Sequence, residues 1–215
     1  MEPRLLEKLN NFFSRFKIQK YKKGEILIRA GDDPSGVFYL KHGRVREYAI
    51  SRKGEEIVVN IFKPPAFFPM SWVINQTPNV YFFEALEDLE LIRAPREEVI
   101  EFVKSEPEIL YNLLSRVYIG TDGLLSRMTY LMSGSAYERL VAELIIIAKR
   151  FGEKNGREIT VETSERDLAS QIGMTRETVS REVKKLKAVG LISFSKKRLI
   201  VKDIGKLEEE LLAEA

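Results

Sequence analysis

Residues 165–189 read ERDLASQIGMTRETVSREVKKLKAV, a stretch that predicts two short helices joined by a tight turn. Ser164 precedes the first helix as its N-cap, and Asp167 stands three residues later, which is a variant of the capping box. Gly173 can take the positive φ that ends a helix. Thr175 then caps the second helix. Two helices joined in this way form a helix-turn-helix, in which the N-terminal residues of the second helix enter the major groove of DNA.

The charge and the side chains of the second helix favour DNA as its partner. The residues predicted to read base edges are Arg176, Glu177, Ser180 and Arg181. The residues predicted to contact the DNA backbone are Thr175, Thr178, Lys184, Lys196, Lys197 and Arg198. Residues 176–202 hold nine lysines and arginines and two glutamates, whereas the formal charge of the whole chain is only +3. Positive charge is therefore concentrated where a phosphate backbone would lie.

Two segments carry a resemblance to a known family: TRETVSR at residues 175–181, and the two β-type runs of GLISFSKKRLIVKD at residues 190–203. They resemble the recognition helix and wing of the cyclic-AMP receptor/fumarate-nitrate regulator family of bacterial transcription factors. Residues 18–103 look like the family's β-barrel effector domain, and residues 106–132 like its dimerisation helix. The resemblance implies a homodimer on a pseudo-palindromic operator in double-stranded DNA, and a contact with RNA polymerase if the protein is an activator. It also implies a G-containing half-site related to TGTGA.

The composition predicts a globular protein of the cytoplasm without a cofactor. The chain has 215 residues, of which 44% are hydrophobic and 31% charged, and no apolar run approaches the length of a membrane span. The N-terminus is charged and amphipathic, unlike a signal peptide. The absence of cysteine excludes disulfides and cysteine-bound zinc or iron–sulfur clusters. His42 is the single histidine, and we expect a solvated turn residue rather than a haem ligand. Neither a catalytic nor a metal-binding constellation is present, so no enzyme activity is expected.

The predicted fold class is α+β. A first helix is expected at residues 3–16, followed by short β-type runs with glycines at turn positions, which suggest a barrel or jelly roll like the cyclic-nucleotide-binding one. The clearest runs are residues 26–28, 37–40, 45–50 and 57–62, and a short helix is expected at residues 96–103. The predicted domains are a sensor barrel at residues 1–105, a dimerisation helix and hinge at 106–133, and a winged helix-turn-helix at 134–215.

A long helix beginning at Pro107 carries apolar residues at spacings of four and three, which is a heptad pattern. The positions of this predicted dimer seam are Leu110, Leu114, Val117, Thr121, Leu124, Met128 and Leu131. The alternative is that the stripe packs on the chain's own barrel, but a stripe this narrow suits a two-stranded coiled coil better. Gly120 and Gly123 weaken the helix, each by about 1 kcal/mol relative to alanine. Residues 132–135 are expected to form a hinge.

The barrel lacks the residues that hold a cyclic nucleotide in the resembled family. Those members carry a Gly-Glu pair for the ribose and, some ten residues later, an Arg-Ser or Arg-Thr pair for the phosphate. Pro69-Met70 and Val80-Tyr81 stand at these positions here, so cyclic nucleotide binding is not expected. The candidate pocket residues are Phe68, Met70, Trp72, Tyr81, Phe83, Leu124 and Leu125. Two interpretations stay open: these side chains fill the old pocket, or they line a cavity for an apolar or aromatic effector.

A second function class is a barrel-type ligand-binding regulator whose winged helix contacts protein. Arg176, Glu177 and Arg181 separate the two classes, because a protein-contact face more often presents aromatic and aliphatic anchors. Three charged side chains at the start of the second helix therefore favour the transcription regulator.

Overall fold

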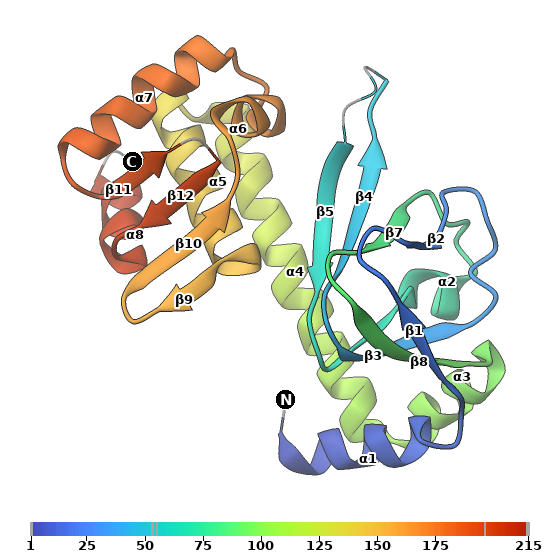
Figure 1. Ribbon diagram of the computed structural model, residues 1–215. Helices are drawn as coiled ribbons and strands as arrows, with labels where there is room; N and C mark the ends of the chain where they lie inside the picture. The colour runs from blue at the N-terminus through green and yellow to red at the C-terminus, as the bar shows by residue number, and fades with distance from the viewer. Residues whose placement is uncertain (1, 53, 55, 196, 214–215) are drawn as a thin grey trace. The chain divides into compact units, whose positions relative to one another are not determined.

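The computed structural model describes residues 2–52, 54, 56–195 and 197–213, which divide into two compact units, Met1–Val117 and Tyr118–Ala215 (Figure 1). Among the described residues, no helix has the length and the apolar character needed to cross a membrane.

The first unit is built on two four-stranded antiparallel sheets (Figure 1). One contains, in spatial order, β1 (Ile18–Tyr21), β8 (Leu89–Ala94), β3 (Val37–His42) and β6 (Ala66–Phe68). The other contains β2 (Ile26–Ile28), β7 (Phe82–Ala85), β4 (Val45–Ile50) and β5 (Glu56–Phe62). Phe38 and Leu91 of the first sheet and Phe83 of the second belong to one buried core, the barrel-side cluster. The two sheets thus enclose a core, as expected of the barrel or jelly roll that the β-type runs and turn glycines suggested.

Helices cover the other face of the sheet that contains β3 and β8. They are α1 (Pro3–Phe13), α2 (Met70–Asn75), α3 (Arg96–Ser105) and the beginning of α4 (Pro107–Ser133). Tyr39 and Ile92, the neighbours of Phe38 and Leu91 along their strands, pack with Phe13 in a second core, the helix-side cluster. Both faces of β3, β6 and β8 are therefore largely buried, whereas the edge strand β1 has no fully buried residue. The predicted first helix ends earlier than residue 16, because the chain tightens into a turn in which the N–H of Phe16 donates to the carbonyl of Phe13.

Helix α4 runs unbroken for 27 residues and passes through Gly120 and Gly123. The predicted seam positions are exposed from Leu110 to Met128; Val117, for example, is 62% exposed. Leu131 differs, because it is half-buried against the core of the second unit. The helix ends at Ser133, and Ser135 immediately caps the next helix, so the predicted hinge is reduced to a very short connection.

The second unit is a winged helix-turn-helix, as predicted (Figure 1). Its elements after α4 are α5 (Ala136–Phe151), β9 (Glu153–Asn155), β10 (Glu158–Glu162), α6 (Glu165–Ile172), α7 (Arg176–Ala188), β11 (Ile192–Ser195), β12 (Arg198–Val201) and α8 (Ile204–Ala213). The strands form one antiparallel sheet in the order β11-β12-β10-β9. Leu144 of α5, Leu168 of α6 and Leu186 of α7 are fully buried in its core.

A buried ion pair joins α4 to this core. Glu143 of α5 is almost completely buried; its Oε1 accepts a hydrogen bond from Arg127 Nη2 of α4 at 3.0 Å, and its Oε2 lies 2.9 Å from Arg127 Nε in an ion pair. Arg127 Nη2 also donates to the backbone carbonyl of Gln171 near the end of α6, at 3.4 Å. One arginine thus links three helices of the second unit and neutralises a carboxylate that would be costly to bury alone.

Candidate nucleic-acid interface

Both ends of α6 are fixed by the local features that the sequence predicted. Ser164 caps α6 by accepting from the N–H of Asp167 at 3.2 Å, and the Asp167 carboxylate accepts from the N–H of Ser164 at 2.9 Å. Gly173 ends α6 with a φ of +65°, the left-handed conformation that glycine adopts without steric cost. The predicted capping box and C-cap are therefore confirmed.

Helix α7 begins at Arg176, with the Thr175 hydroxyl accepting from the N–H of Thr178 at 3.2 Å. The hydroxyls of Thr175 and Thr178 lie 3.1 Å apart. Val179, Val183 and Leu186 form the apolar row that holds α7 against the core. This packing fixes which face of α7 points outward.

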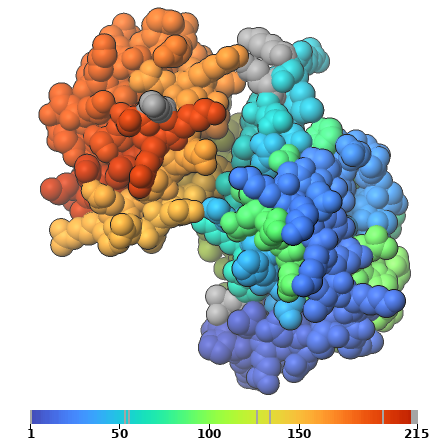
Figure 2. Space-filling model, in the orientation of Figure 1, coloured from blue at the N-terminus to red at the C-terminus, as the bar shows by residue number. Residues whose placement is uncertain are grey.

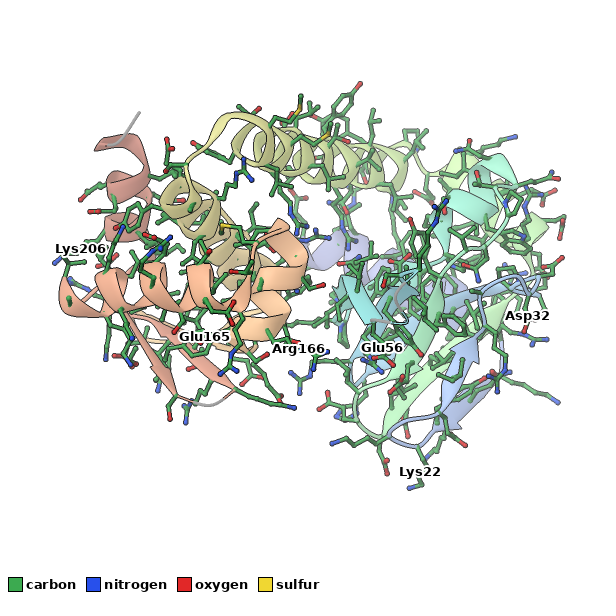
Figure 3. The ribbon with its side chains drawn as sticks, turned by 90° about the horizontal axis from the view of Figure 1, so that it is seen from above. Lys22, Asp32, Glu56, Glu165, Arg166 and Lys206 are labelled. Atoms are coloured by element: carbon green, nitrogen blue, oxygen red, sulfur yellow. The ribbon has the colours of Figure 1, made fainter. Side chains whose placement is uncertain are left out.

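The outward face of α7 brings together the residues predicted to read bases. Arg176, Glu177, Arg181 and Lys184 are exposed and Ser180 is half-buried. All five line one shallow depression of about 340 Å³ together with Glu165 of α6, which is labelled in Figure 3. Helical spacing explains the grouping, because residues three, four and seven apart share a face. Glu165 was missed by the sequence reasoning; its position at the start of α6, across the turn from Arg176, was the available signal.

The Glu177 carboxylate stays ionised at this helix start. Its own backbone N–H and the Thr175 hydroxyl donate hydrogen bonds to it, and both lower its pKa below the ordinary value. Glu177 is therefore an acceptor at neutral pH, which is the form needed to accept from the amino group of cytosine.

The wing is held by hydrogen bonds to the rest of the unit. Strands β11 and β12 pair antiparallel with Ser195 opposite Arg198. The N–H of Thr163 donates to the carbonyl of Lys197 at 2.9 Å, and Lys187 Nζ on α7 donates to the carbonyl of Phe194 at 3.3 Å. Lys197 and Arg198 are exposed, whereas Lys196, also predicted to contact the backbone, lies outside the described residues. Figure 2 shows the surface of this unit in colours that run from yellow through orange to red.

The residues predicted to line an effector pocket do not fall into one cluster. Phe68 and Phe83 are each 1% exposed and stack in the barrel-side cluster, with ring centroids 5.3 Å apart and planes 4° apart. Tyr81 packs against the same cluster, whereas Met70 and Trp72 pack against the helix-side cluster. Met70 and Trp72 belong to helix α2, which packs on the helix side of the sheet, whereas Phe68 of β6 faces the other sheet. Phe62 adds a further ring, 4.6 Å from Phe68, so aromatic side chains occupy the centre of the barrel.

Leu124 and Leu125, the remaining pocket candidates, belong to the second unit and are exposed. His42 is exposed at the end of β3. Within the described part of the chain, no three His, Cys, Asp or Glu residues are grouped as metal ligands.

Comparison with protein families assigns both units. Residues 18–106 match the cyclic nucleotide-binding domain family, and residues 138–210 match the Crp-like helix-turn-helix domain family. The chain is 29% identical over 192 residues to a global nitrogen regulator of a Nostoc species, covering 86% of this chain and 84% of the relative. It is 25% identical over 206 residues to an anaerobic regulatory protein of Haemophilus influenzae, covering 95% and 79%.

Solved structures share the fold over nearly the whole chain. A CooA mutant from Carboxydothermus hydrogenoformans matches with a TM-score of 0.70 at 24% identity, covering 96% of this chain and 95% of that one. A transcriptional regulator of the CRP/FNR family from Thermus thermophilus matches with a TM-score of 0.65 at 22% identity, covering 93% and 99%.

Proposed function

The chain belongs to the CRP/FNR family of bacterial transcription regulators, and from this we propose that it binds a pseudo-palindromic DNA operator as a homodimer, with α7 of each protomer in the major groove. RNA polymerase is a further partner if the protein activates transcription. The relatives in the comparison are regulatory proteins, and the chain is accordingly a transcription regulator rather than an enzyme.

One observation carries the proposal: the row of exposed charged side chains on α7. Arg176, Glu177, Arg181 and Lys184 line one depression at the start of a helix whose opposite face is locked into the core. Arginine donates two parallel hydrogen bonds to guanine, and glutamate accepts from cytosine. Thr175, Thr178, Lys184, Lys197 and Arg198 are proposed to contact phosphates on either side of this row.

The direct test is binding of the intact chain to an operator selected from random duplexes, measured over a range of salt concentrations. Phosphate contacts release counterions, so the logarithm of the binding constant should fall steeply with the logarithm of the salt concentration. The selected sequence should contain two related half-sites about one helical turn apart. Binding that is insensitive to salt, or no enriched sequence, would instead favour a winged helix that contacts protein.

The proposed dimer rests on the exposed seam of α4. Val117 and Leu124 are 62% and 53% exposed although both are apolar, and they lie in the heptad row that predicted a coiled coil. Val117→Glu with Leu124→Glu should give a monomer in sedimentation. Operator binding should weaken, because a monomer contacts only one of the two half-sites. Arg116→Glu, an exposed position away from the row, is the control and should leave the dimer intact.

The barrel is proposed to have lost cyclic nucleotide binding. Pro69, Met70, Val80 and Tyr81 replace the expected acid and arginine, and the Phe68 ring stack occupies the centre of the barrel. A cyclic phosphate placed there would lose its hydration without gaining a charged partner. Any effector would therefore be apolar or aromatic.

A further inference from the structure

Helix α7 carries one charged residue on the side that faces the core. Val179, Glu182, Val183 and Leu186 are its buried residues. The Glu182 side chain is only 4% exposed, while its two basic neighbours, Arg181 and Lys185, are 67% and 59% exposed. A buried carboxylate requires close partners of opposite charge. Any function of Glu182 therefore acts through the two cationic side chains that it contacts.

The two carboxylate oxygens of Glu182 are divided between these cations. Arg181 Nε donates to Oε1 at 3.1 Å, and Lys185 Nζ lies 2.6 Å from Oε2. Burial raises the pKa of Glu182, but the hydrogen bonds from Lys185 and Arg181 outweigh burial and leave the pKa below its ordinary value. Glu182 is therefore ionised at neutral pH and can hold the guanidinium of Arg181.

The atom by which Arg181 is held decides what remains for DNA. Its Nε is engaged with Glu182, and the two Nη nitrogens carry the remaining N–H donors of the planar guanidinium. Guanine is recognised by two parallel donors, which the Nη pair supplies. A guanidinium fixed before binding also loses less side-chain freedom when it contacts a base.

We propose that Glu182 is a positioning residue that orients Arg181 for guanine recognition and so sets base preference at one position of each half-site. The proposal rests on the proposed function, because it requires Arg181 to read a base. It assigns a role in specificity to a buried residue that does not itself line the depression at the start of α7.

The second arginine of the interface provides a contrast within the same molecule. Arg176 Nε lies 3.9 Å from Glu165 Oε2, beyond hydrogen-bonding distance, and the Glu165 side chain is 24% exposed. Glu165 thus contributes negative charge to the same depression without holding Arg181. Glu165→Gln is therefore a charge-matched control for substitutions at Glu182.

The test uses the intact chain and measures a discrimination ratio: the dissociation constant for the operator with one G·C pair replaced, divided by the dissociation constant for the selected operator. Arg181→Ala identifies the base pair that Arg181 reads, where the ratio should fall about 5- to 150-fold. At that base pair Glu182→Gln should lower the ratio about two- to tenfold, which corresponds to the cost of ordering one flexible side chain. It should also tighten binding to every duplex, since a negative charge is lost.

Glu182→Asp separates geometry from charge. Aspartate keeps the charge but is one methylene shorter, so it should lower the ratio without changing the salt dependence. Glu165→Gln should tighten binding to both duplexes equally and leave the ratio at this base pair unchanged. Thermal unfolding shows whether each variant is folded. If Glu182→Gln is unstable, the discrimination ratio of Glu182→Asp decides the proposal.

Two results would overturn the proposal. If Arg181→Ala lowers the ratio at one base pair while both Glu182 variants leave it unchanged, Glu182 does not position Arg181. If Arg181→Ala weakens all duplexes equally, Arg181 reads no base and the positioning role falls with it. In either case, a steep salt dependence of binding and an enriched operator sequence would still support DNA binding. Failure of the inference is therefore distinct from failure of the proposed function.

Discussion

Arg181 and Arg198 carry the same charge but are placed differently. Arg181 lies on the outward face of a helix and is held by Glu182, whereas Arg198 begins strand β12 at the wing and is exposed. An arginine that enters the groove discriminates between bases, while one beside the groove meets phosphates that are the same in every sequence. The two residues should therefore affect binding in different ways.

Replacing Arg181 by alanine should cost about 1–3 kcal/mol on the operator and relax base preference at a single position. Replacing Lys197 and Arg198 should weaken operator and random DNA alike and flatten the salt dependence, because phosphate contacts are lost. Competition binding with both duplexes distinguishes the outcomes. Equal losses on operator and random DNA for Arg181→Ala would contradict its assignment as a base reader.

The pair of Arg127 and Glu143 makes the stability of the second unit depend on pH. Burial raises the pKa of Glu143 more than Arg127 lowers it, so the folded chain holds this proton more tightly than the unfolded chain does. The stability that protonated Glu143 contributes is therefore fully present below the ordinary pKa of the residue, near 4.5. It is lost as the pH rises through the raised pKa of Glu143 in the folded chain.

Arg127→Met should cost about 3–5 kcal/mol at pH 7.5, because an unpaired carboxylate is left buried. The loss should be smaller at pH 5, since the unpaired Glu143 then takes up a proton. Hydrogen exchange of the α5 backbone amides, measured at increasing urea concentration, reports the free energy of unfolding of the second unit. Combining Arg127→Met with Glu143→Leu should restore most of the stability and remove the pH dependence. An equal loss at both pH values would show that the charge of Glu143 is not the cause.

Interactions between residues close in sequence were the ones that the sequence predicted. The caps at Ser164 and Thr175 and the left-handed Gly173 depend on partners within three or four residues, so local spacing identifies them. Glu165 and Glu182 were not identified, because their roles depend on the positions of Arg176 and Arg181 side chains in the folded unit. The residue type alone does not distinguish a buried acidic residue from an exposed one.

At the scale of elements, α4 packs against the cores of both units. Ile109 near its beginning packs in the helix-side cluster, and Leu131 near its end packs against the second unit. The heptad spacing predicted the exposed row between them but placed Leu131 in that row, because periodicity gives the face of a residue and not the neighbour that covers it. The helix is continuous through Gly120 and Gly123, the two residues that were expected to weaken it.

Gly120→Ala with Gly123→Ala should stabilise α4 by up to about 2 kcal/mol, since alanine favours a helix over glycine. Within one chain a methyl group at either position would meet no atom within 4 Å. If order in this segment favours the DNA-binding state, the double variant should bind the operator more tightly and remain dimeric. Operator affinity and sedimentation are measured together. Weaker binding with dissociating dimers would mean that the glycines allow the two helices to approach closely.

At the scale of the whole molecule, two units with separate cores share one chain. The fold class and the elements that were predicted followed from turn glycines, strand spacing and the helix-turn-helix, which are local features of the sequence, whereas α5, β9, β10 and α8 were not predicted. The distribution of aromatic residues did not, because Phe67 and Phe68 are adjacent and equally apolar yet pack in different clusters. Only the register of β6 against β3 determines which ring enters the barrel.

Cyclic AMP and cyclic GMP should not bind the intact protein with useful affinity. The barrel offers no acid and arginine at the expected positions, and the rings of Phe62, Phe68 and Phe83 pack together with centroids 4.6 to 6.0 Å apart. Titration calorimetry with either nucleotide should give no heat beyond dilution. Micromolar binding of either would mean that other residues of the barrel recognise the phosphate.

Strand β6 also has a thermodynamic consequence. Its three residues are all buried, and Phe67 and Phe68 project to opposite sides of the sheet. If β6 leaves the sheet, the helix-side cluster loses the ring of Phe67 and the barrel-side cluster loses the ring of Phe68. The two clusters should therefore melt as a single cooperative unit on heating. Fluorescence of Trp72, the single tryptophan, reports on the helix side, and hydrogen exchange in β7 reports on the barrel side. Their midpoint temperatures should coincide, and two separate midpoints would show that a three-residue strand is too short to link the melting of one layer to the other.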